Sequence, residues 1–172
     1  MKKTILLACV LFFICITVNS QITKGNWILG GDAIIKGYKF ENSEKYRYYA
    51  EFFPKVGYFV SDKLVVGGEV GLYKAENSFL YTSFVPFSRY YLLDSDKNIN
   101  PFFEGGFGVK HFKYRGDEGV LTEVMYYFKA GTSIFFTNSA ALNITLNYKR
   151  DSFQFHKEIS VAFGVQIHLE KK

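Results

Sequence analysis

Apolar and polar residues alternate with a period of two along most of the chain. In Pro101-Phe-Phe-Glu-Gly-Gly-Phe-Gly-Val-Lys110, Glu104 and Lys110 fall on one face together with glycines, and Phe103 and Phe107 fall on the other. Turn-like clusters separate such stretches, and no long helical period is present. The pattern predicts eight β-strands at Asn26–Gly37, Tyr46–Phe59, Leu64–Tyr73, Phe79–Leu92, Asn100–Tyr114, Val120–Phe135, Ala140–Lys149 and Phe153–Leu169.

Tight and longer connections alternate between the predicted strands. The tight ones are Ser61-Asp62-Lys63, Asp94–Asn98 and Thr137-Asn138-Ser139. A meander of eight antiparallel strands can close on itself, which removes the unpaired edges that a bilayer does not tolerate. We therefore predict an all-β fold, a single eight-stranded antiparallel up-and-down transmembrane β-barrel.

Charged residues of both signs occupy the polar face of the predicted strands. They are Asp32, Lys36, Arg47, Glu51, Lys55, Glu69, Arg89, Glu104, Lys110, Glu123, Lys129 and Glu158. On a soluble barrel this face would be the solvated exterior, whereas in a membrane barrel it would line the interior. Because an unpaired buried charge is costly, we expect these residues to form an interior charged network in which opposite charges pair.

Three features favour the inward orientation of the polar face. Glycines such as Gly106 and Gly131 share that face, where a narrow interior needs room for long side chains. The middle of the apolar face carries no charge over about nine to eleven residues per strand, the length that a bilayer requires. Aromatic residues gather near the strand ends, as in the interfacial girdles of membrane barrels. The expected girdles are Trp27, Tyr58, Phe59, Tyr90, Tyr91, Phe102, Phe135 and Phe136 toward one rim, and Tyr38, Tyr46, Tyr48, Tyr73, Phe79, Tyr126 and Tyr148 toward the other.

The predicted fourth strand follows the alternation less cleanly than the others. Arg89 shares its face with Phe87, while Ser88 falls on the apolar side. Pro54 and Pro86 remove backbone donors from the interiors of two strands, which an uninterrupted ladder does not tolerate. We expect β-bulges at both prolines.

The first twenty residues have the composition of a secretory signal peptide. Lys2 and Lys3 precede an apolar run over Ile5–Val18, and Val18-Asn19-Ser20 offers a cleavage site before Gln21. A lipoprotein signal at Leu6-Leu7-Ala8-Cys9 is the alternative, although it would leave a short apolar region. We divide the 172 residues into a signal peptide at 1–20 and one outer-membrane β-barrel domain at 21–172.

The composition argues against several classes of function. Both cysteines, Cys9 and Cys15, lie in the predicted signal peptide, so the rest of the chain has no disulfide framework and no thiol chemistry. The formal net charge of +5 falls to +3 once Lys2 and Lys3 are removed, and no basic cluster is present. Nucleic acid is therefore not an expected partner.

Four segments carry a resemblance to a known family. Pro54-Lys-Val-Gly-Tyr-Phe59, Leu64-Val-Val-Gly-Gly-Glu69, Pro86-Phe-Ser-Arg-Tyr-Tyr91 and Pro101–Gly108 resemble the outer-membrane-protein β-barrel domain family of Bacteroidetes-type bacteria, which is similar to the membrane domain of outer membrane protein A. The resemblance implies an eight-stranded barrel in the cell outer membrane with no established catalytic residues. The end of the chain, His168-Leu-Glu-Lys-Lys172, departs from the terminal aromatic residue that such barrels usually carry.

Few residues offer catalytic or metal-binding chemistry. His156 and His168 share the inward face but are separated by about 40 Å at the rise of a strand, and His111 falls on the other face. Asp151, Ser152 and His156 lie near one loop, but adjacency in sequence is not the geometry of a catalytic triad. Arg115-Gly116-Asp117 spells an integrin-binding tripeptide made of ordinary turn residues. We expect no enzyme activity, cofactor or metal.

The sequence therefore predicts a monomeric outer-membrane barrel with a plugged, charged interior and a structural or interaction role. Its expected partners are outer-membrane lipid and the outer-membrane insertion machinery. One alternative is a soluble lipocalin-like barrel that binds an apolar ligand, since Gly25-Asn26-Trp27 resembles the Gly-x-Trp motif of lipocalins. The other alternative is a narrow pore.

Overall fold

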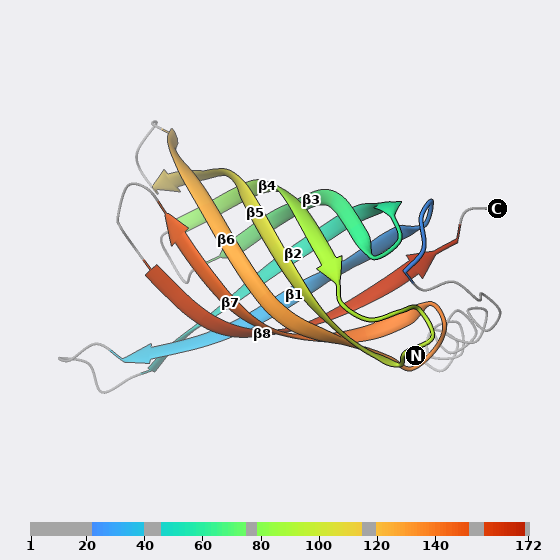
Figure 1. Ribbon diagram of the computed structural model, residues 1–172. Coiled ribbons are helices and arrows are strands. Elements are labelled where there is room, and N and C mark those ends of the chain that lie inside the picture. The colour runs from blue at the N-terminus through green and yellow to red at the C-terminus, as the bar shows by residue number, and fades with distance from the viewer. Residues whose placement is uncertain (1–21, 40–45, 75–78, 115–119, 152–156, 171–172) are drawn as a thin grey trace, which may run out of the picture.

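The computed structural model describes residues 22–39, 46–74, 79–114, 120–151 and 157–170. These residues form eight strands: β1 (Trp27–Lys39), β2 (Tyr46–Ser61), β3 (Leu64–Lys74), β4 (Phe79–Tyr91), β5 (Ile99–Tyr114), β6 (Val120–Phe135), β7 (Ala140–Asp151) and β8 (Lys157–Leu169). Each strand pairs antiparallel with the next, and β1 pairs with β8, so the sheet closes (Figure 1). The predicted all-β, eight-stranded antiparallel up-and-down barrel is confirmed. Within these ranges no helix is long and apolar enough to cross a membrane.

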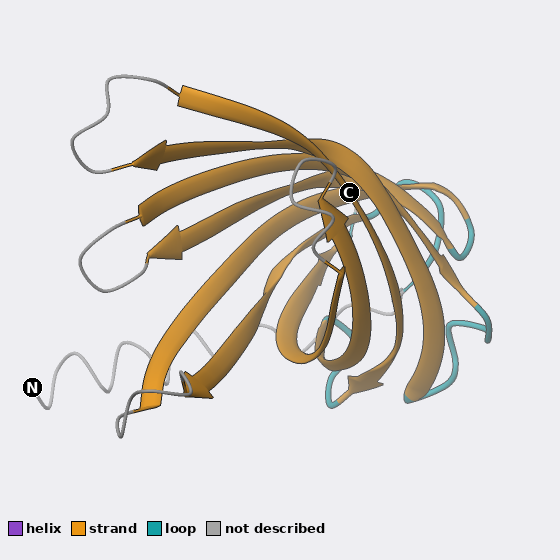
Figure 2. Ribbon diagram, turned by 90° about the vertical axis from the view of Figure 1, so that its left-hand side faces the viewer, coloured by secondary structure: helices purple, strands orange, loops and turns teal. Residues whose placement is uncertain are grey.

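The two ends of the barrel differ in their connections. β1 begins and β8 ends at the same end, which also holds the described turns between β2 and β3, β4 and β5, and β6 and β7 (Figure 2). We call this the short-turn end and the opposite one the far end. The predicted strand bounds differ from the observed ones by up to two residues, except that the predicted start of the last strand, Phe153, lies outside the described residues.

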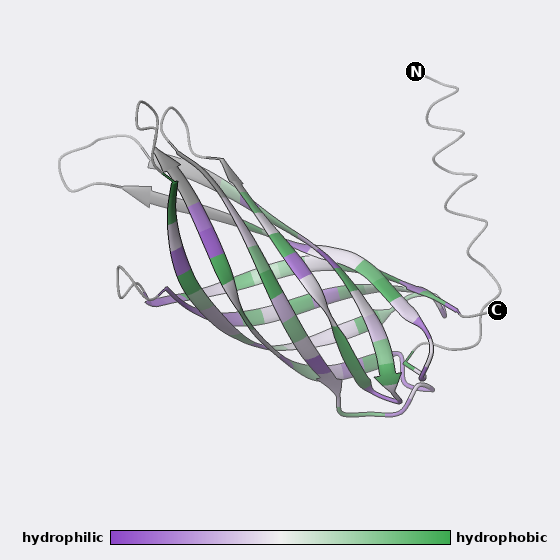
Figure 3. Cartoon of the chain, turned by 90° about the horizontal axis from the view of Figure 1, so that it is seen from above, coloured by the Kyte–Doolittle hydropathy of each residue, from purple (hydrophilic) through white to green (hydrophobic). Residues whose placement is uncertain are grey.

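Buried and exposed positions alternate along the strands, and the charged residues are on the buried side. In β6, Glu123, Tyr127 and Lys129 are buried, whereas Val124 and Phe128 are 41% and 50% exposed. Hydrophobic and hydrophilic residues alternate in the same way along neighbouring strands in Figure 3. The wall of the barrel is therefore apolar outside and polar inside, the reverse of a soluble protein.

The predicted bulges at Pro54 and Pro86 are wrong. The register between β2 and β3 is the same before and after Pro54, and that between β4 and β5 is the same before and after Pro86. Each proline keeps its partner on its other side, which is Gly31 of β1 for Pro54 and Gly68 of β3 for Pro86. Because a residue in an antiparallel ladder exchanges its hydrogen bonds with one neighbour, a missing N–H interrupts pairing on one side only.

Glycines on the inner face lie against side chains and backbone of neighbouring strands. A Cβ atom on Gly164 would lie 2.3 Å from Asp32 Oδ1, and one on Gly106 would lie 2.8 Å from the Tyr127 ring and from Val85. The interior is narrow enough that a long polar side chain fits only where the facing position carries none.

The aromatic residues of the short-turn end divide between the two faces of the wall. Trp27, Tyr90 and Phe136 are about half exposed on the outside, as a girdle requires. The girdle prediction is wrong for four members, which are buried inside the barrel: Phe59, Tyr91, Phe102 and Phe135. They occupy the same parity as the charged residues of their strands, for example Tyr91 two positions after Arg89.

These inward aromatic residues form an apolar layer across the interior at the short-turn end. The layer also contains aliphatic side chains from β1, β3 and the segment before β1, namely Ile28, Val65 and Ile22. Of the second predicted girdle, Tyr126 is 41% exposed and Tyr148 is partly exposed. Its other members lie outside the part of the chain whose side chains are described: Tyr38, Tyr46, Tyr48, Tyr73 and Phe79.

Candidate functional site

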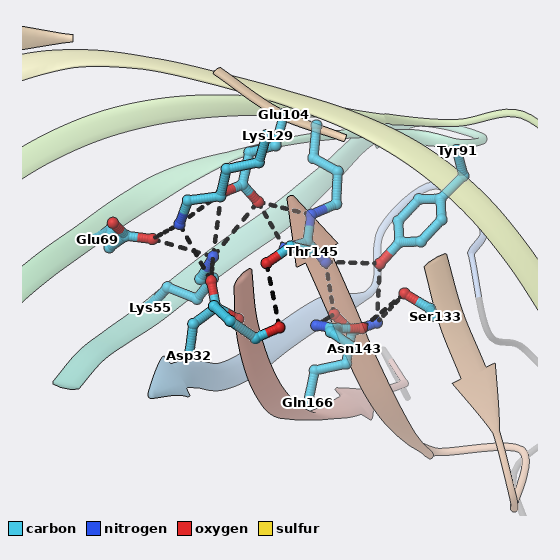
Figure 4. A network of polar contacts seen from close by, with 12 residues as sticks. Asp32, Lys55, Glu69, Tyr91, Glu104, Lys129, Ser133, Asn143, Thr145 and Gln166 are labelled. Atoms are coloured by element: carbon cyan, nitrogen blue, oxygen red, sulfur yellow. Dashed lines mark hydrogen bonds and ion pairs between the residues drawn. The ribbon is translucent and has the colours of Figure 1, made fainter. Parts of the chain in front are cut away.

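Six strands each contribute one charged side chain to a cluster in the middle of the barrel (Figure 4). The members of this central ion cluster are Asp32, Lys55, Glu69, Arg89, Glu104 and Lys129. None is more than 6% exposed. Three carboxylates face three cations, so the cluster is balanced in charge.

Cross-strand register accounts for much of this arrangement. Lys55 lies opposite Glu69 across β2 and β3, and Glu104 lies opposite both Arg89 on β4 and Lys129 on β6. Opposite residues on one face of a sheet have their side chains within reach of each other. The period-two pattern of the sequence thus delivers oppositely charged neighbours to the inner face.

Glu104 is the residue with the most partners in the central ion cluster. Its Oε2 accepts a hydrogen bond of 2.7 Å from Nε of Arg89, and its Oε1 accepts one of 3.0 Å from Nζ of Lys55. The hydroxyl of Tyr127 donates to Oε1 at 3.1 Å, and Nζ of Lys129 lies 3.3 Å from the same atom. A buried carboxylate with this many charged and hydrogen-bonded partners has its desolvation offset.

The two lysines of the cluster each contact all three carboxylates. Nζ of Lys55 lies 2.8 Å from Asp32 Oδ2 and 3.0 Å from Glu69 Oε2. Nζ of Lys129 lies 3.1 Å and 2.6 Å from the same two atoms. Oxygens of Asp32, Glu69 and Glu104 lie within 4.8 Å of one another, a separation at which they can share a cation. Here the shared cations are ammonium groups of the chain itself.

A chain of polar side chains leads from Arg89 toward the short-turn end. Nη1 of Arg89 donates to Gln166 Oε1 at 2.6 Å and to the Tyr91 hydroxyl at 3.2 Å, and Gln166 Nε2 donates to the same hydroxyl at 2.8 Å. Asn143 Nδ2 donates to Gln166 Oε1 at 2.9 Å, and Ser133 Oγ donates to Asn143 Oδ1 at 2.7 Å. This polar chain fills the interior between the central ion cluster and the apolar layer.

The guanidinium of Arg89 also contacts the apolar layer. Its central carbon lies 4.0 Å from the centroid of the Phe102 ring, within the range of a cation–π interaction. His168 lies in the same layer, with its ring 5.6 Å from that of Phe59 and 5.2 Å from that of Phe135. The layer therefore packs directly against the polar chain.

The interior toward the far end is also polar. Nζ of Lys110 lies 2.8 Å from Oδ2 of Asp151, and both side chains are 9% exposed. A cavity of about 20 Å³ is lined by members of the central ion cluster and by residues nearer the far end, including Glu51, Asn147 and Lys149. Such a volume is close to that of one water molecule, too small for an organic ligand.

The twelve residues of the expected interior network fall into four groups. Six form the central ion cluster, and three more are buried closer to the far end: Glu51, Lys110 and Glu123. Glu158 is partly exposed. The side chains of Lys36 and Arg47 lie outside the described part of the chain.

Among the described residues, the other candidate groups do not meet in one site. His168 is buried at the short-turn end, whereas His111 is exposed on the wall and contacts Thr122 Oγ1 at 2.9 Å. His156 and Ser152 lie outside the described residues, as does the tripeptide at 115–117.

Sequence reasoning missed three interior residues: Tyr127 and Asp151, which contact Glu104 and Lys110, and Ile22, which belongs to the apolar layer. Tyr127 stands two positions before Lys129, so parity places it on the inner face. Asp151 stands two positions after Lys149, but the seventh strand was predicted to end at Lys149, so Asp151 was assigned to the following loop; the strand in fact extends to Asp151. Ile22 precedes the first strand, and no periodic signal identifies it.

The sequence matches no protein-family model and no curated protein. Among solved structures, the N-terminal β-barrel domain of OprF from Pseudomonas aeruginosa is similar with a TM-score of 0.67 at 13% identity, over 85% of this chain and 98% of that one. Neisserial surface protein A gives a TM-score of 0.63 at 15% identity, over 86% of this chain and 98% of that one. The outer membrane protein OprG from Pseudomonas aeruginosa gives 0.55 at 11% identity, over 90% and 100%. The resemblance to small outer-membrane barrels is confirmed at the level of the fold.

Proposed function

We propose that this chain is an integral protein of the bacterial outer membrane, with a lipid-facing wall, a closed interior and a structural or interaction role. The observation that carries the proposal is that the wall of the barrel has apolar side chains on the outside and charged ones on the inside. Phe107, Ile159 and Phe163 are 65%, 73% and 57% exposed on the outside, while Arg89 and Glu104 are 0% and 1% exposed inside. Hydrocarbon is the solvent in which that arrangement is favourable.

The fold comparison supports the same location. OprG is an outer membrane protein, and its structure matches this chain over 90% of the residues. A closed barrel satisfies every backbone hydrogen bond within the wall, which a bilayer demands of any β-structure that spans it. We infer that outer-membrane lipid is the main partner of the wall, that the insertion machinery of that membrane assembles it, and that it functions as a monomer.

A soluble lipocalin-like barrel is the less favourable alternative. Such a barrel would need an apolar interior for its ligand and a polar exterior for water. The buried charges of the central ion cluster and the small volume of the cavity beside it count against a bound apolar molecule. The exposed apolar wall would also make the free protein aggregate.

The closed interior is supported by two barriers in series. The central ion cluster joins six strands through contacts of 2.5–3.3 Å, and the apolar layer lies between this cluster and the short-turn end. An ion that crossed would have to separate buried pairs and then pass through aromatic side chains, both of which are costly. A narrow pore would require these contacts to open.

The non-catalytic role is supported by the surroundings of the buried histidine. The His168 ring nitrogen lies 2.7 Å from Gln166 Nε2, and the side chain is 2% exposed. A general base must be within reach of the substrate proton that it removes. A histidine sealed between an amide and aromatic rings does not meet that condition.

Cell fractionation tests the location. After expression from the full-length sequence, we expect the protein in the outer-membrane fraction, extracted only by detergent and migrating faster in gels before boiling than after. Protein that remains soluble without detergent would reject the membrane assignment. Recording from planar bilayers tests the closed interior separately, since reproducible single-channel steps from folded protein would favour the pore alternative.

A further inference from the structure

The segment before β1 folds back into the short-turn end of the barrel (Figure 1). Ile22 is 1% exposed and belongs to the apolar layer, in which it joins Phe59 and Val65. Lys24, two residues later, is exposed. The segment thus presents an apolar side chain to the interior and a charged one to the outside.

The sequence of this segment makes the turn that aims Ile22 inward. The backbone N–H of Asn26 donates to the carbonyl of Thr23 at 3.3 Å, and the Asn26 side-chain amide donates to Thr23 Oγ1 at 3.1 Å. Gly25, the third residue of the turn, has a φ of 95°. A positive φ at this position is the reason why type II turns select glycine.

Backbone hydrogen bonds attach the segment to the last residues of β2. The N–H of Gly25 donates to the carbonyl of Phe59 at 2.9 Å, and the N–H of Phe59 donates to the carbonyl of Asn26 at 2.9 Å. This exchange continues the β1–β2 ladder past the start of β1. The segment is therefore held by the same kind of contact as a strand.

The turn between β2 and β3 holds the other side of the segment. The N–H of Lys63 donates to the carbonyl of Ile22 at 3.1 Å, and the N–H of Lys24 donates to Asp62 Oδ1 at 2.8 Å. Lys63 has a φ of 67°, unusual for a residue with a side chain, and its carbonyl accepts from the N–H of Tyr91 at 2.9 Å. Lys63, in the turn between β2 and β3, therefore connects the segment to β4.

A surface ion pair fixes this junction from the outside. Nζ of Lys63 lies 2.5 Å from Oδ1 of Asp94 in the turn between β4 and β5. The hydrogen bond to Asp94 raises the pKa of Lys63 above its ordinary value. Lys63 thus contacts three parts of the chain: Ile22 of the segment, Tyr91 of β4 and Asp94 of the turn between β4 and β5.

We propose that residues Ile22–Asn26 form a plug that closes the short-turn end of the barrel. The side chain of Ile22 is the part of the plug that fills the interior. The inference rests on the proposed closed interior and assigns the closure at this end to one short segment. On the predicted cleavage before Gln21, Ile22 is the second residue of the processed chain. Cleavage a few residues further along the chain would remove Ile22 and leave this end of the barrel open.

A buried reporter thiol tests the plug. In a background with Cys9→Ala and Cys15→Ala, Ser133→Cys places one thiol on the polar chain directly behind the apolar layer, at a side chain that is 0% exposed. The refolded protein in detergent is treated with a charged, membrane-impermeant methanethiosulfonate, and mass spectrometry gives the rate of labelling. The plug variant is Ile22→Gly, and the matched controls are Ile22→Val and Lys24→Ala.

We expect slow labelling with Ile22 or either control and labelling about tenfold faster or more with Ile22→Gly, because loss of a buried aliphatic side chain lowers the free energy of local opening. Equally slow labelling in all variants would reject the plug while leaving the closed interior intact. Rapid labelling with Ile22 in place would reject both. Only variants that keep heat-modifiable migration are compared, and Thr145→Cys, at a side chain that is 1% exposed, is the second reporter if Ser133→Cys does not fold.

Discussion

Arg89 and Glu104 face each other across β4 and β5 and form a fully buried ion pair inside the barrel. Nε and Nη2 of Arg89 lie 2.7 Å and 2.5 Å from the same carboxylate oxygen, and both side chains are fully buried. A pair of this kind contributes little relative to an apolar pair of the same shape, but loss of one member leaves an unpaired charge without water. The pair therefore makes the fold sensitive to single substitutions.

Glu104→Gln and Arg89→Met should each lower the free energy of unfolding by about 3–5 kcal/mol, because each leaves the central ion cluster with one unbalanced charge. The double variant restores two carboxylates to two cations, so its loss should be smaller than the sum of the single losses. Urea titration in lipid vesicles gives the coupling energy. Asp96→Asn is the control, since the Asp96–Lys97 pair is solvent-exposed and its loss should have little effect. Additive losses in the double variant would contradict the coupling.

Tyr126 and Tyr127 are adjacent on β6 but lie on opposite faces of the wall. Tyr127→Phe removes the hydroxyl that donates to Glu104 at 3.1 Å and should lower the free energy of unfolding by about 1.5–3 kcal/mol, the range for hydrogen bonds to charged groups. The Tyr126 ring is 41% exposed, and its hydroxyl accepts a longer contact of 3.4 Å from Arg150. Tyr126→Phe should therefore change stability by no more than about 0.5 kcal/mol. Equal effects in the two variants would mean that the inward hydroxyl does not support the cluster.

Gly105 and Gly106 provide a similar comparison on β5. A Cβ on Gly106 would lie 2.8 Å from the Tyr127 ring and from Val85, whereas one on Gly105 would have Tyr127 O as its nearest neighbour at 3.9 Å. Gly106→Ala should lower the free energy of unfolding by about 1–3 kcal/mol through overpacking. Gly105→Ala should leave it unchanged or raise it by up to about 1 kcal/mol through the unfolded state. The same vesicle titration measures both, and a stable Gly106→Ala variant would show that the interior is wider than the structure implies.

Local alternation carries enough information to predict the strands and the face on which each residue lies. It assigns Glu104 and Lys129 to one face, and it would have assigned Tyr127 and Asp151 to the same face had it been applied to every position. Alternation cannot say which charges meet, because Lys55 contacts Glu104 across 49 residues of sequence and across the lumen rather than along a ladder. Those contacts depend on the stagger that closes the barrel.

The apolar layer shows a second limit of the sequence pattern. Aromatic residues near strand ends suggest a girdle by composition, yet Phe102 and Phe135 face inward because parity, not position along the strand, decides the side of the wall. Ile22 lies before the first strand and is buried by residues from β2 and β3. The position of Ile22 depends on the turn at residues 23–26 and on the shape of the short-turn end of the barrel. No repeating pattern in the sequence encodes either of them.

Phe107 offers a direct test of the lipid-facing wall, since it lies near the middle of β5 and is 65% exposed. In a bilayer, Phe107→Lys should lower the free energy of unfolding by about 2–4 kcal/mol because the ammonium group would lie in hydrocarbon. Ile99, the first residue of the same strand, is 58% exposed, and Ile99→Lys should cost only about 0–1 kcal/mol because its charge can reach the interface. Urea titration in lipid vesicles compares the two variants, which share chemistry and strand and differ in depth. On a soluble barrel both lysines would be solvated, so equal and small effects would contradict the membrane-spanning wall.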